Sequence, residues 1–355
     1  MKLFVASENK DIESRVSITP DIVKKLVSLN HEVFVHSGAG ERAGFVDEEY
    51  QNSGAKTPET FTESDVIFSI NPLSKEITDQ LKSGTIVISS QENQGKSDLT
   101  IFALNKIPRT TRAQYMDVLS SQASLAGYKA MIEASHVLNR AIPLMMTTAG
   151  TIPAAKVLII GAGVAGLQAI ATAKRLGAVV SAFDVRTSAK EQVESLGAKF
   201  IEVNSNEKTD GVYAKEMTKD YKRAQEQKLR EVLPSQDIVI TTAQIPGKKA
   251  PVIIKADMIE TMKNGSVIID LAAKTGGNCE LTVSGQTIEQ GGVKIIGFGN
   301  ILNLIPYDAS RLFAKNIFSF FELLTSKMKE QPDISKIEDD IIQATLVTDN
   351  ERRRK

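Results

Sequence analysis

The 355-residue sequence is poor in the residues that build cross-links and metal centres. It contains one cysteine and three histidines. A single cysteine excludes a disulfide framework within the chain and is typical of a reducing compartment. So few soft ligands leave almost nothing for a transition-metal site, and we expect no metal.

An excess of charge and a long apolar run are also missing. Lysine plus arginine and aspartate plus glutamate both number 43, for a formal net charge of +0. That balance gives no support to nucleic-acid binding. No run of about 18 apolar residues exists, so we expect no membrane span. The opening MKLFVASENK lacks the apolar core of a signal peptide.

The length favours two domains, and the beginning of the chain alternates between strand and helix patterns. Strands are expected at KLFVAS (2–7), 31–38, 65–70 and 84–90, and an amphipathic helix at 20–29. This βα alternation predicts a parallel sheet. A long helix follows at about residues 117–140, with small residues at helical spacing that indicate close packing.

A second βαβ series begins at residues 155–186 and continues through AKFIEV (198–203) and strands near 237–243, 265–272 and 293–298. A late helix at 310–328 is expected to return to the first domain. We therefore predict an α/β protein with two Rossmann-like parallel-sheet domains joined by long helices, the first domain being discontinuous. The predicted boundaries are 1–123 plus 306–345 for the first domain, 124–305 for the second, and 346–355 for a basic tail.

A glycine-rich turn marks a dinucleotide site in the second domain. Gly161, Gly163 and Gly166 form G-x-G-x-x-G between the buried strand KVLII and a helix. The first glycine permits the tight turn, the second lets the backbone approach a pyrophosphate, and the third allows close helix–strand packing. The helix N-terminus, from Val164 on, then presents free N–H groups to the diphosphate.

The next strand, VVSAFD, ends in Asp184, about 20 residues after the glycines as the fingerprint requires. This carboxylate is expected to accept hydrogen bonds from the adenosine ribose and to repel a 2′-phosphate. Arg186 nearby favours the phosphorylated cofactor, but the carboxylate makes NAD(H) the better expectation. Asp184, Val185 and Arg186 are therefore assigned to cofactor binding; the alternative is a Rossmann fold without a dinucleotide.

Ligands bind at the carboxyl ends of strands in open parallel sheets, which makes Gln244 and Asn278 candidates to line the nicotinamide half. For Asn278 the alternative is a turn residue after two glycines. Residues 204–230 exceed an ordinary connection. Tyr213 and Met217 in that segment suit a lid over the cofactor, and the alternative is the exposed start of a polar helix.

The stretch RTTRAQYMDVLSSQ (109–122) has the polarity of an active-site loop but contains no His, Cys, Lys or Glu. Its candidates are Arg109, Gln114, Asp117 and Ser120. The alternative is a capped helix start, with Asp117 as N-cap and Arg109 solvated.

Several stretches resemble a known family. ESRVSITPDIV, HEVFVHSGAGERAGFVDEEY and GAGVAG are similar to alanine dehydrogenase and to the NAD(H)-binding domain I of proton-translocating nicotinamide nucleotide transhydrogenase. Alanine dehydrogenases carry a substrate lysine where this chain has Asn71, a catalytic aspartate where it has Lys274, and a catalytic histidine in the segment that here reads IFALNKIPRTTRAQ.

Four other segments resemble the transhydrogenase: RAQYMDVLSSQASLAGYKA, GVYAKEM, TTAQIPGKKAP and DLAAKTGGNCE. We call residues 109–120 the signature loop. The resemblance implies that this loop and the tyrosine of GVYAKEM are catalytic. The residues so implied are Arg109, Gln114, Asp117, Ser120 and Tyr213, with Tyr115, Met116 and Val212 joining Gln114 and Asp117 in cofactor binding.

The resemblance implies a Re/Si-specific, proton-translocating NAD(P)⁺ transhydrogenase. NAD(H) is bound by this chain and NADP(H) by domain III of a beta subunit, with membrane subunits carrying the proton path. A homodimer is implied, located in the cytoplasm and peripheral on the cytoplasmic or matrix-equivalent face of the inner membrane. The alternatives are an alanine dehydrogenase-like enzyme and a non-catalytic NAD-sensing module.

Overall fold

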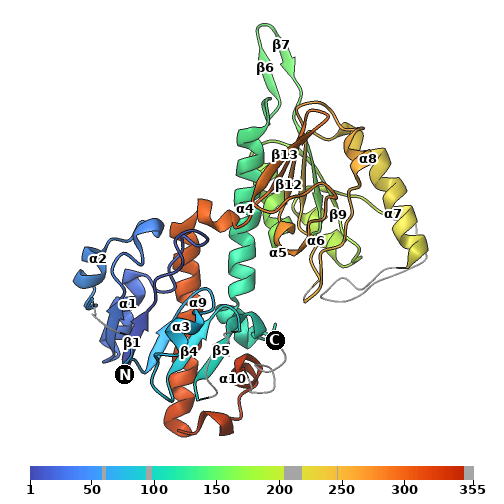
Figure 1. Ribbon diagram of the computed structural model, residues 1–355. Helices are drawn as coiled ribbons and strands as arrows, with labels where there is room; N and C mark the ends of the chain where they lie inside the picture. The colour runs from blue at the N-terminus through green and yellow to red at the C-terminus, as the bar shows by residue number, and fades with distance from the viewer. Residues whose placement is uncertain (58–60, 93–97, 204–217, 246, 348–355) are drawn as a thin grey trace. The chain divides into compact units, whose positions relative to one another are not determined.

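The computed structural model describes residues 1–57, 61–92, 98–203, 218–245 and 247–347. The chain divides into two compact units (Figure 1). The first unit contains residues 1–122 and 302–355, and the second contains residues 123–301. The first unit is therefore built from both ends of the chain, which confirms the expected discontinuous first domain.

The first unit is built on a five-stranded, all-parallel sheet with the order β2-β1-β3-β4-β5. Its strands are β1 (Lys2–Val5), β2 (Glu32–Val35), β3 (Val66–Phe68), β4 (Ile86–Ser89) and β5 (Thr100–Ala103). Successive side chains point to opposite faces of a strand. Leu3 and Val5 therefore enter one hydrophobic core and Phe4 enters another.

Helices cover both faces of this sheet. They are α1 (Pro20–Ser28), α2 (Asp47–Asn52), α3 (Lys75–Thr78), α9 (Pro306–Glu330) and α10 (Asp340–Thr345), with 3₁₀ helices η1 (Glu41–Ala43), η2 (Leu104–Lys106), η3 (Thr111–Met116), η6 (Ile301–Leu304) and η7 (Ile334–Lys336). Phe320 of α9 packs edge-on against Phe102, and Phe321 packs edge-on against Phe68. The late helix thus completes the core that the early strands begin.

The second unit is built on a seven-stranded sheet with the order β10-β9-β8-β11-β12-β14-β13, in which β13 alone is antiparallel. The strands are β8 (Lys156–Ile160), β9 (Val179–Phe183), β10 (Lys199–Phe200), β11 (Ile238–Thr241), β12 (Val267–Asp270), β13 (Gln286–Gln290) and β14 (Val293–Gly297). The strand order reverses between β8 and β11, which is the doubly wound pattern of a Rossmann fold. The expected fold class is confirmed.

Helices α5 (Val164–Arg175) and α6 (Ala189–Ser195) lie on one face of the second sheet, and α7 (Lys219–Val232) and α8 (Ala256–Ile259) on the other (Figure 1). Two 3₁₀ helices, η4 (Leu233–Ser235) and η5 (Ala273–Thr275), complete the unit. In the described part of the chain, no helix combines the length and apolarity needed to cross a bilayer.

The long helix α4 (Val118–Val137) begins in the first unit and continues into the second. Its small residues permit close packing, as expected. A Cβ atom on Gly127 would lie 1.9 Å from the carbonyl oxygen of Ala165, in the first turn of α5. The backbone of α4 therefore lies directly against the start of the helix that follows the glycine-rich turn.

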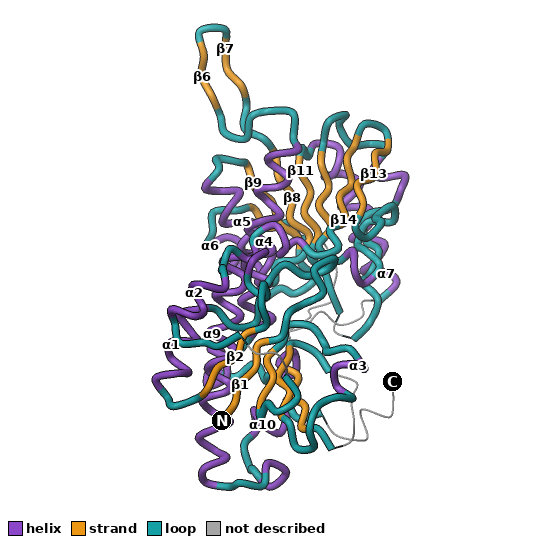
Figure 2. Tube along the Cα trace, turned by 60° about the vertical axis from the view of Figure 1, so that its left-hand side comes forward, coloured by secondary structure: helices purple, strands orange, loops and turns teal. Residues whose placement is uncertain are grey.

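A two-stranded hairpin, β6 (Met145–Thr147) and β7 (Gly150–Ile152), extends away from the rest of the second unit (Figure 2). Its side chains are exposed, and Met146 is 83% accessible to solvent. The hairpin, β5 and the edge strand β13 have no counterpart among the strands expected from the sequence.

Candidate functional site

The glycine-rich turn forms a tight cradle at the carboxyl end of β8. Gly161 has a φ of +97°, and a Cβ atom on it would lie 2.6 Å from Oγ1 of Thr242. A Cβ atom on Gly166 would lie 1.8 Å from the carbonyl oxygen of Gly161. Gly163, the N-cap of α5, has no atom within 4 Å of its own Cβ position. The turn is therefore closely packed at Gly161 and Gly166 and open at Gly163.

This cradle fits the diphosphate of a dinucleotide. The first N–H groups of α5 have no partner within the helix, and the helix dipole favours an anion at that end. The open space at Gly163 lets such an anion reach the backbone. Val164, the first residue of α5, is partly exposed beside it.

Asp184 lies against the same turn, at the carboxyl end of the neighbouring strand β9. Its Oδ2 accepts a hydrogen bond from the backbone N–H of Ala162 at 2.7 Å. Arg186 donates its backbone N–H and Nε to Oδ1 at 2.8 and 2.9 Å, and Nη2 to Oδ2 at 2.9 Å. These hydrogen bonds raise the pKa of the Arg186 guanidinium. The structure thus brings Asp184, the half-buried Val185 and Arg186 to the glycine turn, as the fingerprint predicts.

The bonds to Asp184 limit how a ribose can reach it. A carboxylate has about four lone-pair positions, and the four bonds from Ala162 and Arg186 use that capacity. Hydroxyl groups of a ribose would therefore take the places now held by the Arg186 side chain, which means that Arg186 must move when a ligand binds there.

The loops after β11 and β12 are held together by buried polar side chains. Asn278 is fully buried; its Oδ1 accepts from Ala243 N, and its Nδ2 donates to the carbonyl oxygens of Ala243 and Pro251. The amide thus braces the loop, which favours the turn-residue alternative, and a cofactor contact stays a prediction. Gln244 is exposed and donates Nε2 to the carbonyl oxygen of Leu271 at 3.2 Å.

Cys279 provides a test of this packing. Burial raises the pKa of its thiol to about 11, and the side chain is 1% exposed. Because the thiolate is the reactive form, we expect the native protein to resist an aromatic disulfide reagent at pH 8. One thiol per chain should react after unfolding in guanidinium, since the sequence holds one cysteine. Rapid labelling of the native chain would contradict the burial of this loop.

The signature loop contains η3, which ends at Met116, followed by Asp117 and the start of α4. Asp117 accepts hydrogen bonds from the backbone N–H and the hydroxyl of Ser120, at 2.9 and 2.6 Å. This is the geometry of an N-cap, so the structure gives Asp117 at least the capping role that the sequence left open. Contact of Asp117 or Ser120 with a cofactor stays a prediction.

Other residues of the loop differ in exposure. Arg109 and Gln114 are exposed, and Tyr115 is 69% accessible. The side chain of Met116 is buried in the core of the first unit. The loop thus presents an amide and a phenol at its surface and uses Met116 as an anchor.

Residues far along the chain that the sequence did not single out, Asp339 and Asn316, hold this loop in place. Arg112 forms a bidentate pair with Asp339 at 2.8 and 3.2 Å and also contacts Asp340, at the start of α10. Asn316 of α9 bonds to Tyr115 and Ser121. In the sequence, the only sign of the Asn316 contacts is the position of this asparagine among the apolar residues of LFAKNIFSFFELL.

The switch point of the first sheet, between β1 and β3, is filled by buried charges of the protein itself. Asn71 donates Nδ2 to Glu8 at 3.0 Å and to Glu13 at 3.3 Å. Glu13 accepts two hydrogen bonds from the guanidinium of Arg15 and one from its backbone N–H, and the guanidinium also donates to Gln122 at 2.7 Å. Burial raises the pKa of Glu8. Burial also acts to raise the pKa of Glu13, but the bonds and charge of Arg15 outweigh it and lower that pKa.

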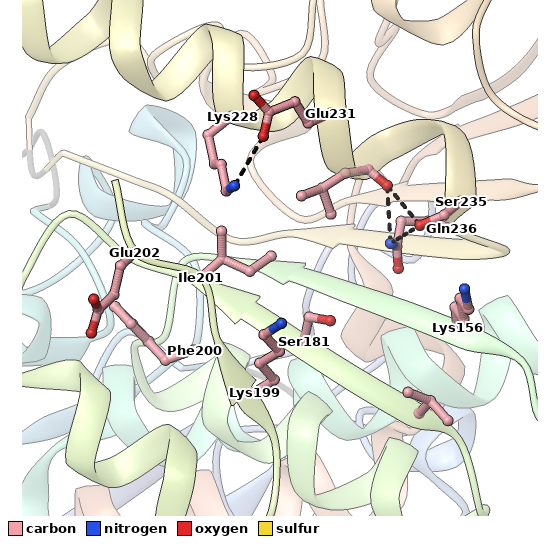
Figure 3. Close-up of a pocket in the computed structure, with 12 residues that line it drawn as sticks. Lys156, Ser181, Lys199, Phe200, Ile201, Glu202, Lys228, Glu231, Ser235 and Gln236 are labelled. Atoms are coloured by element: carbon pink, nitrogen blue, oxygen red, sulfur yellow. Dashed lines mark hydrogen bonds and ion pairs between the residues drawn. The ribbon is translucent and has the colours of Figure 1, made fainter. Parts of the chain in front are cut away.

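A cavity of about 550 Å³ lies elsewhere, between α7 and the strands β8, β9 and β10 (Figure 3). Lys156, Val179 and Lys199, the first residues of the three strands, line it together with Lys228 and Gln236. It thus opens at the amino ends of the strands, whereas the glycine cradle lies at their carboxyl ends. The two features are distinct.

Three predicted positions, Val212, Tyr213 and Met217, lie outside the described residues. The later part of the long segment is helical, because α7 begins at Lys219 after its N-cap Thr218. That part agrees with the polar-helix alternative, and the lid stays a prediction.

Comparisons with known proteins agree with this architecture. The alanine dehydrogenase/PNT N-terminal domain family matches residues 4–126, and the C-terminal domain family matches residues 130–354. The chain is 44% identical to a protein of Rhodospirillum rubrum named as the first part of NAD(P) transhydrogenase subunit alpha, over 98% of this chain and 96% of that protein.

The crystal structure of transhydrogenase from Sinorhizobium meliloti superposes with a TM-score of 0.85 and 42% identity, over 98% of this chain and 97% of that chain. Alanine dehydrogenase 2 of Staphylococcus aureus is more distant, at 30% identity over 79% of this chain and 74% of that protein. The chain belongs to the alanine dehydrogenase/PNT family, and within it to the NAD(P) transhydrogenase alpha subunits.

Proposed function

We propose that this chain binds NAD(H) in the second unit and exchanges a hydride with NADP(H) held by a partner polypeptide. The observation that carries the proposal is the open glycine cradle with Asp184 bonded to its backbone. A carboxylate at this point is matched to ribose hydroxyls and repels a 2′-phosphate, so the non-phosphorylated nucleotide is favoured.

The residues of the cradle would divide the work of binding. Gly161, Gly163, Val164 and Gly166 would hold the diphosphate with backbone N–H groups. Asp184, Val185 and Arg186 would bind the adenosine ribose, Arg186 moving aside as described above. Gln244 and Asn278 would border the nicotinamide half.

The signature loop would act by positioning. When bound, NADH supplies a hydride, and its passage between two nicotinamide rings makes or breaks no O–H or N–H bond. This chemistry needs no general acid or base, which agrees with the absence of His, Cys, Lys and Glu from residues 109–122. Gln114, with Arg109, Asp117, Ser120 and Tyr115, would orient the ring, and Met116 would support them as the buried anchor of the loop. Val212 and Tyr213, outside the described residues, are assigned to the same task.

We assign the second nucleotide to a separate domain, because these 355 residues contain one G-x-G-x-x-G fingerprint. We assign NADP(H) to domain III of a beta subunit and the proton path to membrane subunits, which places this chain at the cytoplasmic or matrix-equivalent face of the inner membrane. This makes the assembly a Re/Si-specific, proton-translocating enzyme. The exposed apolar side chains of the β6–β7 hairpin support a homodimer.

Alanine dehydrogenase activity is the alternative, and the charged side chains that surround Asn71 oppose it. An amino-acid carboxylate entering that switch point would meet Glu8 and Glu13, and Arg15 is already held by Glu13. Like charges in a buried site repel strongly. L-Alanine should therefore give no NADH with the purified chain. An NAD-sensing module would bind NADH but transfer no hydride to any partner domain.

Replacing Gln114 by asparagine tests the proposal. We expect hydride transfer to a supplied NADP(H)-binding domain to fall by about tenfold, since one hydrogen bond made in the transition state is withdrawn. The affinity for NADH should change less than about twofold, because the cradle is untouched. Fluorescence titration and a stopped-flow transfer assay measure the two quantities.

Gln51→Asn provides the matched control. Gln51 is an exposed glutamine of α2, in the same unit but outside the loop. This variant should keep both quantities. Unchanged transfer in Gln114→Asn would remove Gln114 from the mechanism, and the absence of transfer by the unmodified chain with every partner domain would refute the proposed activity itself.

A further inference from the structure

Asn316, in the middle of helix α9, forms hydrogen bonds on both sides of the junction between the signature loop and α4. Asn316 is 8% exposed, among the phenylalanines of the α9 core face. Its Nδ2 donates to the carbonyl oxygen of Tyr115 at 2.7 Å, and its Oδ1 accepts from the hydroxyl of Ser121 at 2.6 Å. One side chain thus clamps a segment about 200 residues earlier in the chain.

The clamped segment is where regular structure breaks. The 3₁₀ helix η3 ends at Met116, Asp117 has an extended conformation with ψ of 90°, and α4 starts at Val118. Backbone groups at such a junction lack regular helical partners, so side chains must set their geometry. Within the segment, Asp117 caps the start of α4 by accepting hydrogen bonds from Ser120. Asn316 is the brace from outside it.

The two bonds determine which way the amide points. A carbonyl oxygen can only accept, so the group facing Tyr115 must be the NH₂. A flipped amide would place its oxygen against that carbonyl oxygen and leave two acceptors in contact. Position 316 therefore requires a side chain with both a donor and an acceptor. An aspartate carboxylate has the same shape as asparagine but lacks the donor.

We propose that Asn316 is a positioning residue for hydride transfer: through Tyr115 and Ser121 it sets the backbone path that presents Gln114 and Asp117. This inference rests on the proposed function. Gln114 directly precedes Tyr115, and its own carbonyl oxygen lies 3.4 Å from the backbone N of Asp117. A shift of Tyr115 is therefore transmitted to both residues along a short stretch of backbone.

The test is Asn316→Asp, with hydride transfer to a supplied NADP(H)-binding domain and NADH binding measured in parallel. The new carboxylate faces the Tyr115 carbonyl oxygen and repels it. We expect the transfer rate to fall by about tenfold or more, because small misplacements of reacting groups have large effects on rate. The NADH dissociation constant should stay within about twofold, since the cradle lies in the other unit.

A pH profile separates positioning from simple loss of structure. When protonated, the introduced carboxyl can donate an O–H to the Tyr115 carbonyl oxygen and restore the missing bond. The ratio of variant to unmodified rate should therefore rise towards one as the pH falls from 8 to 5. A constant ratio would overturn the donor requirement.

Asn303→Asp is the matched control. Asn303 also bridges two main-chain groups of the first unit, accepting from Ser14 N and donating to the carbonyl oxygen of Ile12, both at 3.0 Å. It should lose stability in the same way but keep the transfer rate of its folded fraction. Equal loss of transfer in both variants would mean that Asn316 has only a structural role.

Ser121→Ala decides the matter if Asn316→Asp does not fold. It removes only the hydroxyl at the other end of the clamp and should lower transfer by about threefold. Transfer at the unmodified rate in Ser121→Ala would overturn the inference. Transfer by the unmodified chain is measured alongside, so a failure of the proposed function is recognised separately.

Discussion

Replacing Gly166 by alanine is expected to destabilise the second unit and to weaken NADH binding strongly. The added Cβ would lie 1.8 Å from the carbonyl oxygen of Gly161. Both groups are fixed by backbone, so no side chain can turn away and α5 must shift from β8. We expect the free energy of unfolding to fall by about 3 kcal/mol. NADH affinity should fall by roughly a hundredfold, as two backbone bonds to the diphosphate are misplaced. Denaturant titration and fluorescence titration measure these effects.

Gly163→Ala is the control that separates packing from binding. Its Cβ would meet no atom within 4 Å, and Gly163 has a φ of −76°, which alanine adopts without strain. Stability should be unchanged or slightly higher, while NADH binding should weaken because the methyl group fills the open side of the cradle. Wild-type stability in Gly166→Ala would show that α5 does not pack on the turn as described.

Replacing Asp270 by asparagine is expected to produce the second large effect. Asp270 is fully buried at the end of β12 and accepts four hydrogen bonds, from Ala272 N, Asn278 N, Cys279 N and the Thr282 hydroxyl, at 2.7 to 3.0 Å. An amide offers one oxygen, and its NH₂ must face a donor. With one buried donor unsatisfied and the charge-assisted bonds weakened, stability should fall by about 3 kcal/mol.

Asp257→Asn is the matched control for this change. Asp257 pairs with Arg230 on the surface, and its side chain is 60% exposed. The same substitution there should alter stability by less than about 1 kcal/mol. Thiol labelling of Cys279 during denaturant titration reports the loop directly. A midpoint for Asp270→Asn equal to that of Asp257→Asn would contradict the bracing role of Asp270.

Local patterns in the sequence predicted most of the fold that positions the cradle. Apolar strands alternating with amphipathic helices imply parallel sheets, and Asp184 at the proper distance from the glycines located the neighbouring strand. Three of the strands that were not anticipated have weak patterns, and the fourth, β5, is a buried strand of four residues. The edge strand β13 reads QTIEQ and is mostly exposed, and β6 and β7 are exposed throughout, so neither has a buried face to reveal it.

The candidate site was predictable only where its residues lie close in sequence. The cradle is confined to a stretch of about 25 residues that follows a fingerprint. The supports of the signature loop come from α9 and α10, and no periodicity links Tyr115 with Asn316 or Arg112 with Asp339. Such pairings depend on the tertiary path of the chain. The occupied acceptor positions of Asp184 were likewise hidden, because they depend on the rotamer of Arg186.

The discontinuity of the first unit imposes an order on the folding of a chain that leaves the ribosome from its N-terminus. Arg112 is synthesised 227 residues before Asp339, an interval of roughly 10 to 45 s at ordinary translation speeds. The second unit, residues 123–301, emerges whole within that interval. During this time Phe68 and Phe102 lack the α9 phenylalanines that later cover them. The inserted unit is thus expected to mature first, while the nascent first sheet keeps an uncovered apolar face that molecular chaperones recognise.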